Sequence, residues 1–246
     1  MITRRSMIVG GGLLLSGCDK LVRQPAVDGW VEGAAGLHLP AQRLLVARQA
    51  LAREFSAKEV SPTFRANGNT QPEDDSWIAH ANDGFARWNL RVEGLVRRPL
   101  DIPLHALKAM PQRRQITRHD CVEGWSAIGQ WMGPELRGIL SLAGLLPQAR
   151  YIVFHCADRT GEDPYYESID LIDAFHPQTI LAWSMNGQPL PVEHGAPLRL
   201  RVERQLGYKQ AKYVTRIEAR ASLAGLYGGK GGYWEDVAGY QWYAGI

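Results

Sequence analysis

Beyond residue 87 the hydrophobic positions either alternate with polar ones or form short runs, which predicts many short strands. Trp88 to Val96 alternates apolar and polar side chains, as a half-buried strand does. Tyr151 to His155 is a short apolar run typical of a buried strand. Asn186-Gly187 is a dipeptide that favours a hairpin turn. Further strands are predicted at 115–118, 179–185, 197–202 and 213–219, and short helices at 103–110, 134–143 and 169–174.

The chain before residue 88 is less regular. Residues 41–55 place Leu44, Leu45, Leu51 and Phe55 at helical spacing, which predicts an amphipathic helix packed on the domain. Residues 61–72 have almost no period and predict a loop. Strands dominate and the strand–helix alternation of a doubly wound sheet is missing. The predicted class is therefore α+β, with mostly antiparallel or mixed sheets and short helices.

Composition and charge narrow the function classes. The chain has 246 residues, 45% of them hydrophobic, which is enough to bury a core without disulfides. Its net charge of +3 includes Arg4 and Arg5 of the N-terminal segment, so the remainder stands near 3 − 2 = +1. This charge gives no electrostatic case for a nucleic-acid partner. The glycine-rich segment 225–232 lacks the Gly-Lys-Ser/Thr of a phosphate loop, and we interpret it as a flexible flap.

Residues 1–18 have the features of an export signal. Thr3-Arg4-Arg5-Ser6-Met7-Ile8-Val9 has the twin-arginine arrangement, and the apolar stretch after it is too short to span a bilayer. Twin-arginine signals export folded proteins, often with a cofactor already inserted. Leu15-Ser16-Gly17-Cys18 resembles a lipobox, whose cysteine is acylated; the alternative is an ordinary cleaved signal. We expect a periplasmic or other extracytoplasmic protein with a lipid anchor, a tether and helix over 19–60, and a folded domain over 61–246.

Two cysteines remain beyond Cys18, and three roles are open to them. Cys121 and Cys156 are candidates for buried core positions or for a disulfide in an exported protein. Cys121 also opens the run Cys121-Val-Glu-Gly-Trp-Ser126, whose residues build a tight, polar, backbone-lined site.

Seven separated segments, taken in order, resemble the sulfite-oxidase-like molybdopterin oxidoreductases. This family includes sulfite oxidases, plant nitrate reductases and a periplasmic methionine-sulfoxide reductase subunit. The resemblance runs from about Phe64 to about Ile217 and implies the sulfite-oxidase-like molybdopterin-binding fold. The segments are Phe64-Arg-Ala-Asn-Gly68, Cys121-Val-Glu-Gly-Trp-Ser126, Tyr165-Tyr-Glu-Ser168, His176-Pro-Gln-Thr-Ile-Leu-Ala182, Asn186-Gly-Gln-Pro-Leu190, His194-Gly-Ala-Pro-Leu-Arg-Leu200 and Gly207-Tyr-Lys-Gln-Ala-Lys212.

The resemblance implies a molybdenum–molybdopterin cofactor with Cys121 as the thiolate ligand of the metal, a role that suits a soft sulfur. It implies that Arg199 clamps the pterin phosphate, that Lys212 adds a point charge, and that His194 hydrogen-bonds the pterin. The competing interpretations are surface charges for the two cations and a structural histidine. Further cofactor contacts are implied at Asn67, Gly68, Cys156, Gly207 and Lys209, that of Cys156 mainly through its backbone.

Two residues are candidates for catalysis beside the metal. Tyr165 lies three residues before Ser168, as does the active-site tyrosine of sulfite oxidases, and the resemblance implies a role in proton movement. Its neighbour Tyr166 is the alternative, and packing is the plain interpretation for either. Arg118, three residues before Cys121, either faces the substrate pocket or braces the loop.

The departures from the family pattern bear on substrate and partners. Val-Glu-Gly-Trp after Cys121 replaces the Gly-Asn-Arg of sulfite oxidases and removes one anion-binding arginine, so the chain is closer to the methionine-sulfoxide reductase branch. The immunoglobulin-like dimerisation domain of the family and a haem motif are both missing from the sequence, so we expect a separate cytochrome or other electron-transfer partner. The aromatic segment 233–243 has no family counterpart; covering the pocket, docking the partner and plain packing are all open.

The leading hypothesis is therefore two-electron oxygen-atom transfer on a small substrate, with the chemistry carried by the cofactor. Sulfoxide reduction and sulfite oxidation are both open. A second hypothesis is a molybdopterin-binding lipoprotein without turnover, and a third is an exported scaffold without cofactor.

Overall fold

The computed structural model describes residues 37–246, and its helices and strands are short, as the sequence pattern predicts. The helices are α4 (His38–Leu45), α5 (Asp75–Asn82), α6 (Leu104–Ala109), α7 (Leu136–Ala143), α8 (Leu171–Ala174) and α9 (Tyr233–Ala238), with single 3-10 turns at Ala57–Glu59, Val192–His194 and Gly207–Lys209. The strands are β1 (Asn89–Gly94), β2 (Leu100–Pro103), β3 (Gln112–Asp120), β4 (Ser126–Pro134), β5 (Tyr151–Thr160), β6 (Asp163–Asp170), β7 (Ile180–Ala182), β8 (Ser184–Met185), β9 (Gln188–Pro189), β10 (Arg199–Arg201) and β11 (Val214–Arg220).

The chain divides into two units, Met1–Ala47 and Arg48–Ile246. In the first unit, α4 buries none of its residues. No helix in the part of the chain that the structure describes is long and apolar enough to cross a membrane. The predicted signal at 1–18, with its acylation site, lies outside the described residues.

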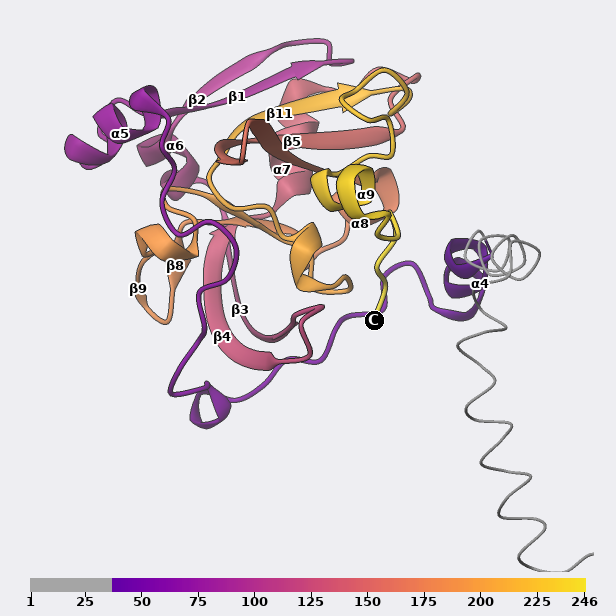
Figure 1. The fold of residues 1–246 in the computed structure, drawn as a ribbon, viewed down its shortest axis with the longest axis horizontal. Coiled ribbons are helices and arrows are strands. Elements are labelled where there is room, and N and C mark those ends of the chain that lie inside the picture. Colours follow the sequence, from indigo (N-terminus) through magenta and orange to yellow (C-terminus); the bar gives the residue numbers. More distant parts are fainter. Residues whose placement is uncertain (1–36) are drawn as a thin grey trace, which may run out of the picture. The chain divides into compact units, whose positions relative to one another are not determined.

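A five-stranded sheet carries the main core of the second unit. Its strand order is β2-β1-β11-β5-β6, in which β1 and β11 are parallel and the other neighbours are antiparallel (Figure 1). Alternation places Leu90 and Val92 of β1 fully inside, where they join Ile139 and Leu140 of the amphipathic helix α7. Mixed strand direction and short helices confirm the predicted α+β class.

The second sheet, of order β3-β4-β8-β9, presents the loop that begins at Cys121. β3 and β4 form one long antiparallel hairpin that curves beside the β8–β9 hairpin (Figure 1). Asn186 and Gly187 both have positive φ at the β8–β9 turn, as predicted for this dipeptide. A separate pair, β7 and β10, brings Arg199 opposite Ala182.

The predicted helix over 41–55 is wrong beyond Leu45. The backbone of Ala52 is bound on both sides by the amide of Gln178, and Glu54 forms a β-bridge with Thr117. These contacts with distant parts of the chain satisfy the backbone groups that a helix would have used, so tertiary pairing overrides the local period. These contacts belong to the second unit, which begins at Arg48.

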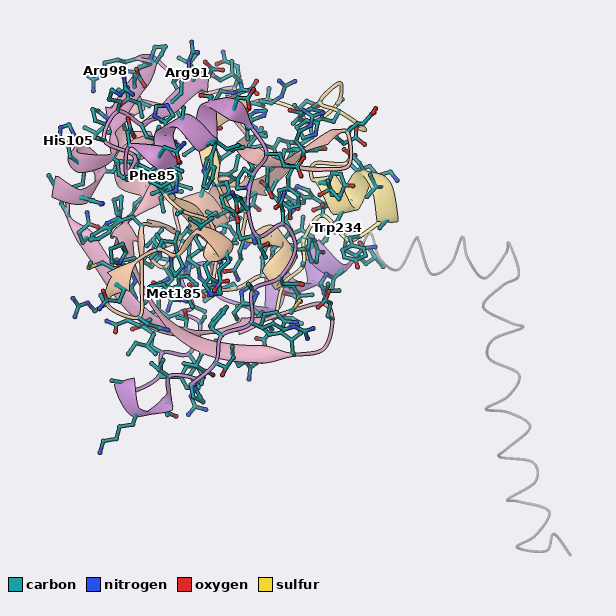
Figure 2. The ribbon with its side chains drawn as sticks, turned by 60° about the vertical axis from the view of Figure 1, so that its left-hand side comes forward. Phe85, Arg91, Arg98, His105, Met185 and Trp234 are labelled. Atoms are coloured by element: carbon teal, nitrogen blue, oxygen red, sulfur yellow. The ribbon has the colours of Figure 1, made fainter. Side chains whose placement is uncertain are left out.

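The C-terminal segment folds back and is fixed by buried polar contacts. Lys209 Nζ lies 2.5 Å from Glu167 Oε2 and also bonds Glu235 of α9, with all three side chains fully buried. Asp236 of the same helix accepts hydrogen bonds from Tyr166 and from the amides of Gly228 and Lys230. The glycine-rich loop is thus tied to α9, which also carries Trp234 (Figure 2).

Candidate functional site

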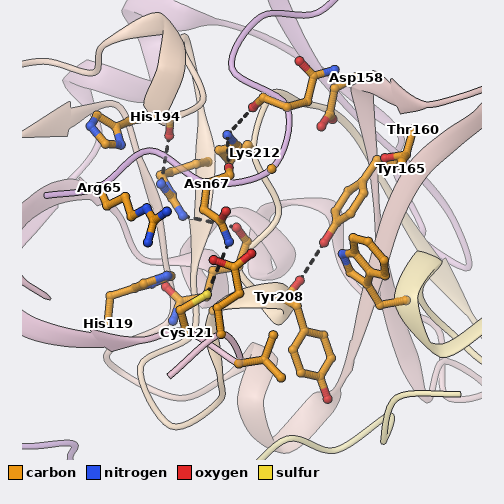
Figure 3. Close-up of a pocket in the computed structure, with 18 of the residues that line it drawn as sticks. Arg65, Asn67, His119, Cys121, Asp158, Thr160, Tyr165, His194, Tyr208 and Lys212 are labelled. Carbon is orange, nitrogen blue, oxygen red and sulfur yellow. Dashed lines mark hydrogen bonds between the residues drawn. The ribbon is translucent and has the colours of Figure 1, made fainter. Parts of the chain in front are cut away.

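A cavity of about 590 Å³ opens beside the Cys121 loop, within the size range of ligand pockets (Figure 3). Its lining joins segments that are far apart in the sequence: the 64–69 loop, the Cys121 loop, the ends of β5 and β6, the 193–212 region and α9. The predicted site residues that line it are Asn67, Gly68, Cys121, Tyr165, His194, Arg199, Gly207 and Lys212.

Cys121 is held at the cavity by a tight turn between β3 and β4. Its amide donates to Trp125 O at 2.9 Å, and Gly124 donates to Cys121 O at 3.0 Å. Gly124 adopts φ +85°, a conformation that disfavours side chains, which explains the glycine in Glu-Gly-Trp. The sulfur accepts a hydrogen bond of 3.3 Å from Asn67 Nδ2 (Figure 3). Cys121 and Cys156 are both free thiols.

Arg199 is a buried cation that lacks a carboxylate partner among the described residues. It donates to the carbonyls of His194 (2.9 Å) and Gln210 (3.3 Å), and its guanidinium lies 5.0 Å from the ring centroid of Trp131. Its Nε is buried and has no partner in the described chain. Burial, reinforced by the charge of Arg201, lowers the pKa of Arg199 to about 9. An anion in the cavity would relieve this unfavourable charge.

Lys212 adds a second cation, and His194 remains neutral beside them. Lys212 donates to the carbonyls of Asn67 (2.7 Å) and Glu193 (3.0 Å) and also to that of Asn69, so it fixes the 67–69 loop. Burial, and then the charge of Arg199, lower the pKa of Lys212 to about 8 and that of His194 to about 4. At neutral pH the His194 imidazole can therefore accept as well as donate a hydrogen bond.

Gly207 lines the cavity, and its position leaves no room for a side chain. A Cβ at this position would lie 2.4 Å from His119 Nε2. His119 also lines the cavity, and its Nδ1 lies 3.1 Å from Arg201. Burial, together with the nearby Arg201, lowers the pKa of His119 well below its usual value. This histidine is therefore a neutral group of the site.

Tyr165 reaches the cavity, whereas Tyr166 does not line it. The Tyr165 hydroxyl donates to Tyr208 O at 2.8 Å (Figure 3). Burial, with Glu167 as the next cause, raises its pKa well above the usual value, so the phenol keeps its proton. Tyr166 follows on the other face of β6 and donates to Asp236. Its role is packing and anchoring of α9.

Three predicted site residues are not brought to the cavity. Arg118 pairs with Asp120 at 2.8 Å, because residues 118 and 121 have opposite parity on an extended strand and so point to opposite faces. The structure thus favours bracing of the loop over substrate contact for Arg118. Lys209 is enclosed by its two glutamates. Cys156 packs against the main core, and burial raises the pKa of its thiol well above the usual value.

Sequence reasoning missed several groups that line the cavity. His119 had a signal, since it shares the face of Cys121 two residues before it. Arg65 lies inside the quoted Phe64–Gly68 segment. Asp158 had no signal, because its direction depends on an irregularity of β5. Trp234 and Tyr240 come from the aromatic segment 233–243, which has no family counterpart.

The rings of Tyr208, Trp234 and Tyr240 form one side of the cavity, here called the aromatic wall. The ring centroids of Tyr208 and Tyr240 are 5.0 Å apart in an edge contact, and Tyr240 stacks on Trp234 at 5.8 Å. Such contacts position rings without the need for a ligand. The polar and ionisable side chains of Asp158, His194, Arg199 and Lys212 also line the cavity and are here called the polar wall.

Comparison with known proteins gives concordant matches. The sequence model of a family described as the oxidoreductase molybdopterin binding domain matches residues 77–224. A putative protein-methionine-sulfoxide reductase subunit YedZ1 from Azospira oryzae is 36% identical over 242 residues, covering 98% of this chain and 86% of the relative. Among solved structures, the sulfane dehydrogenase SoxCD from Paracoccus pantotrophus matches 56% of this chain with a TM-score of 0.51 and 22% identity. This chain spans 39% of that one, and the likeness concerns the fold.

Proposed function

The chain belongs to the family of oxidoreductases with a molybdopterin-binding domain, and on that premise we propose that it reduces a sulfoxide by two-electron oxygen-atom transfer. The balance is one sulfoxide, two electrons and two protons giving one thioether and one water. The electrons come from a separate redox protein.

The residues of the cavity fit the cofactor of this family, molybdenum–molybdopterin. A buried sulfur with an amide donor offers a metal ligand, and two buried cations offer a site for a phosphate. The Nε of Arg199 is a buried donor that has no partner within the described chain, as expected where a ligand completes the site. The protein is an oxidoreductase of the molybdenum–molybdopterin type. When bound, the cofactor supplies the oxygen-atom transfer.

The observation that carries the proposed reaction is the position of Cys121. Its side chain lines the cavity, and its sulfur accepts a hydrogen bond from Asn67 (Figure 3). In our proposal Cys121 ligates the metal, while Arg199 and Lys212 hold the pterin phosphate. His194 and the Asn67–Gly68 backbone contact the pterin, and Tyr165 keeps a proton at its hydroxyl beside the substrate.

The aromatic wall favours a thioether-type substrate over the sulfite dianion. Rings stabilise sulfur and methyl groups by dispersion and sulfur–aromatic contacts. A dianion would need several buried cations, yet Arg118 is turned away to Asp120, position 123 carries a glutamate, and the further arginines of the lining, Arg65 and Arg159, are exposed. The relative named as a methionine-sulfoxide reductase subunit supports the same choice. Sulfite oxidation remains the second candidate.

The cellular setting follows from the first eighteen residues of the sequence. We propose export in the folded state through the twin-arginine route and acylation at Cys18. An anchor of this kind would hold the enzyme near a membrane-bound or periplasmic cytochrome. That the relative is named as a subunit agrees with a separate partner. Fractionation of wild type and Cys18→Ala tests the anchor: the variant should leave the membrane fraction.

The assay that tests the reaction uses protein purified from cells that make the cofactor. The enzyme is reduced, and its reoxidation is followed with methionine sulfoxide, an aryl methyl sulfoxide and an N-oxide; reduction of the oxidised enzyme is followed with sulfite. Faster reoxidation by the S-oxides supports the proposal. Turnover of sulfite alone would replace it with the second candidate. Bound molybdenum without any turnover would indicate a cofactor-binding protein that is not an enzyme.

A further inference from the structure

The helix α4 has an apolar face that is exposed to solvent. Leu37, Ala41, Leu44 and Leu45 are spaced i, i+4, i+7 and i+8, so they share one side of the helix, here called the α4 face. Leu44 is 86% exposed, Leu45 81% and Leu37 68%. The helix α7 has the same length, yet it buries four apolar residues against the main core. Clustered apolar side chains that stay exposed indicate a surface that binds a partner.

The charges near the α4 face are of one sign. Residues 37–53 contain Arg43, Arg48 and Arg53 but no aspartate or glutamate, whereas the whole chain has 28 basic and 25 acidic residues. Arg48 is exposed, and the side chain of Arg53 is 76% exposed and lies 3.9 Å from Glu59. Leucines on one face of a helix with arginines nearby are typical of helices that lie in the interface of a membrane with anionic lipids. The charge pattern thus favours an anionic lipid surface as the occupant of the α4 face.

The α4 face also lies close in sequence to the proposed lipid anchor. Cys18 and His38 are 38 − 18 = 20 positions apart, a length of chain that reaches at most about 70 Å. An acyl anchor alone would therefore leave the folded unit loosely tethered. Arg48, the first residue of the second unit, follows Leu45 by three positions, which is at most about 10 Å of chain. Attachment of α4 would hold the start of that unit at the membrane surface.

We propose that α4 lies in the membrane interface, with the α4 face among the acyl chains and the arginines at the phosphates of anionic lipids. A single short helix face binds a membrane weakly and reversibly, and stable attachment needs a second signal. The helix therefore adds to the anchor at Cys18 and does not replace it, so Cys18→Ala still leaves the membrane fraction. The inference concerns location and does not depend on the cofactor or on the sulfoxide as substrate.

The test measures hydrogen exchange of the α4 amides in the full-length protein by mass spectrometry. Three states are compared: Cys18→Ala without lipid, wild type on vesicles of phosphatidylcholine, and wild type on vesicles of phosphatidylcholine and phosphatidylglycerol in equal amounts. A helix this short is marginal by itself in water, so its amides should exchange fast without lipid. On the anionic vesicles exchange should slow about tenfold or more, and on the neutral vesicles it should slow less. The amides of α7 are the internal reference and should exchange alike in all three states.

Variants of exposed side chains locate the contact. Leu44→Ser/Leu45→Ser should lose the slowing on anionic vesicles, because it removes most of the apolar area of the α4 face. Leu142→Ser, which replaces an exposed leucine of α7, is the matched control and should behave as wild type. Arg48→Gln should reduce the difference between anionic and neutral vesicles. Since all these side chains are exposed, each variant should melt within about 2 °C of wild type, which shows that it is folded.

The following results would overturn the proposal. Slow exchange of the α4 amides without lipid would show that another part of the chain covers the α4 face. Exchange as fast on anionic vesicles as without lipid, or wild type that does not float with the vesicles, would leave no contact between α4 and the membrane. Slowing that persists in Leu44→Ser/Leu45→Ser would place the contact elsewhere. The sulfoxide assay is independent of all these measurements, so the proposed reaction stands or fails separately.

Discussion

The two walls of the cavity are built in different ways. In the polar wall (Asp158, His194, Arg199 and Lys212), Asp158 and Arg199 each have one buried side-chain atom without a hydrogen-bond partner in the described chain. The aromatic wall (Tyr208, Trp234 and Tyr240) consists of rings that contact one another. In the polar wall, the free-energy cost of desolvating the buried polar groups is not fully offset by hydrogen bonds within the chain. In the aromatic wall, the contacts between the rings are favourable without a ligand.

This difference supports the proposal that the two walls bind different ligands. Incomplete buried polar groups indicate a resident ligand that stays bound and restores their interactions, which is the role of a cofactor. The apolar rings of the aromatic wall suit a substrate that must leave after each turnover. The segment that carries Trp234 and Tyr240 also lies beyond residues 77–224, the part matched by the family. The family match thus includes Asp158, His194, Arg199 and Lys212 of the polar wall and Tyr208 of the aromatic wall, but neither Trp234 nor Tyr240.

The largest effect is expected for Cys121→Ser. Changes even to groups around a metal ligand lower affinity or activity about 10–100-fold, so loss of the ligand itself should lower sulfoxide turnover by more than about 100-fold. Reoxidation of the reduced enzyme measures it. Cys156→Ala, which removes a thiol that does not line the cavity, is the control and should keep both molybdenum and turnover. If both variants behaved alike, the distinction between the two cysteines would be lost.

The polar wall should make the cofactor-free protein sensitive to pH. The pKa of Asp158 is raised from 3.8 to about 7 in the folded state, so folding retains a proton that the unfolded chain releases. Its contribution to the free energy of unfolding should therefore fall as pH rises from about 4 to 7, by up to about 4 kcal/mol at 1.36 kcal/mol per pH unit.

Denaturant titrations of the cofactor-free protein across this pH range measure the effect. Asp158→Asn should remove that part of the slope, whereas Trp234→Phe in the aromatic wall should retain it. A slope that is the same in wild type and Asp158→Asn would show that the carboxyl is ionised or solvated in the folded protein.

Arg199→Gln tests the phosphate side of the polar wall. Loss of charge-assisted hydrogen bonds to a phosphate should weaken pterin retention by roughly 10–100-fold. Without cofactor the same variant should be at least as stable as wild type, since a buried cation is removed. Pterin content and thermal melts measure the two effects, and Arg91→Gln, an exposed arginine of β1 (Figure 2), is the control. Unchanged pterin retention would place the phosphate elsewhere.

A substitution in the aromatic wall should have the smallest effect, and it should change substrate binding rather than cofactor retention. Trp234→Ala should raise KM for an aryl methyl sulfoxide about tenfold, in line with the contact area and sulfur–aromatic contribution of one ring. Pterin and molybdenum content should not change. Val237→Ala, an exposed position of the same helix α9, is the control. A loss of pterin in Trp234→Ala would mean that the two walls bind the same ligand.

The sequence predicted those features that depend on neighbouring residues. Alternation identified β1, and Asn186-Gly187 identified the β8–β9 hairpin, because each depends on local backbone geometry. The helix at 41–55 failed where Gln178, far along the chain, binds the backbone of Ala52. The motifs that resemble the family located the Cys121 loop and two cations that line the cavity, Arg199 and Lys212.

The rest of the site depends on the way distant segments meet. Arg118 is close to Cys121 in sequence, but strand parity directs it to the opposite face. Asp158 faces the cavity only because of the bulge in β5. Trp234 reaches it because Glu235 is held by the buried Lys209, a contact between groups 26 positions apart. Contacts of this kind, between segments far apart in the chain, cannot be predicted from the pattern of neighbouring residues.

The central claim is that Cys121 binds the metal of a molybdopterin cofactor in this cavity, and X-ray absorption at the molybdenum edge tests it most directly. Wild-type protein and Cys121→Ser are compared as purified from cells that make the cofactor. The account predicts that wild type has one more sulfur ligand than the variant, with the pterin sulfurs common to both. An equal number of sulfur ligands in the two proteins, or wild-type protein without molybdenum, would contradict it.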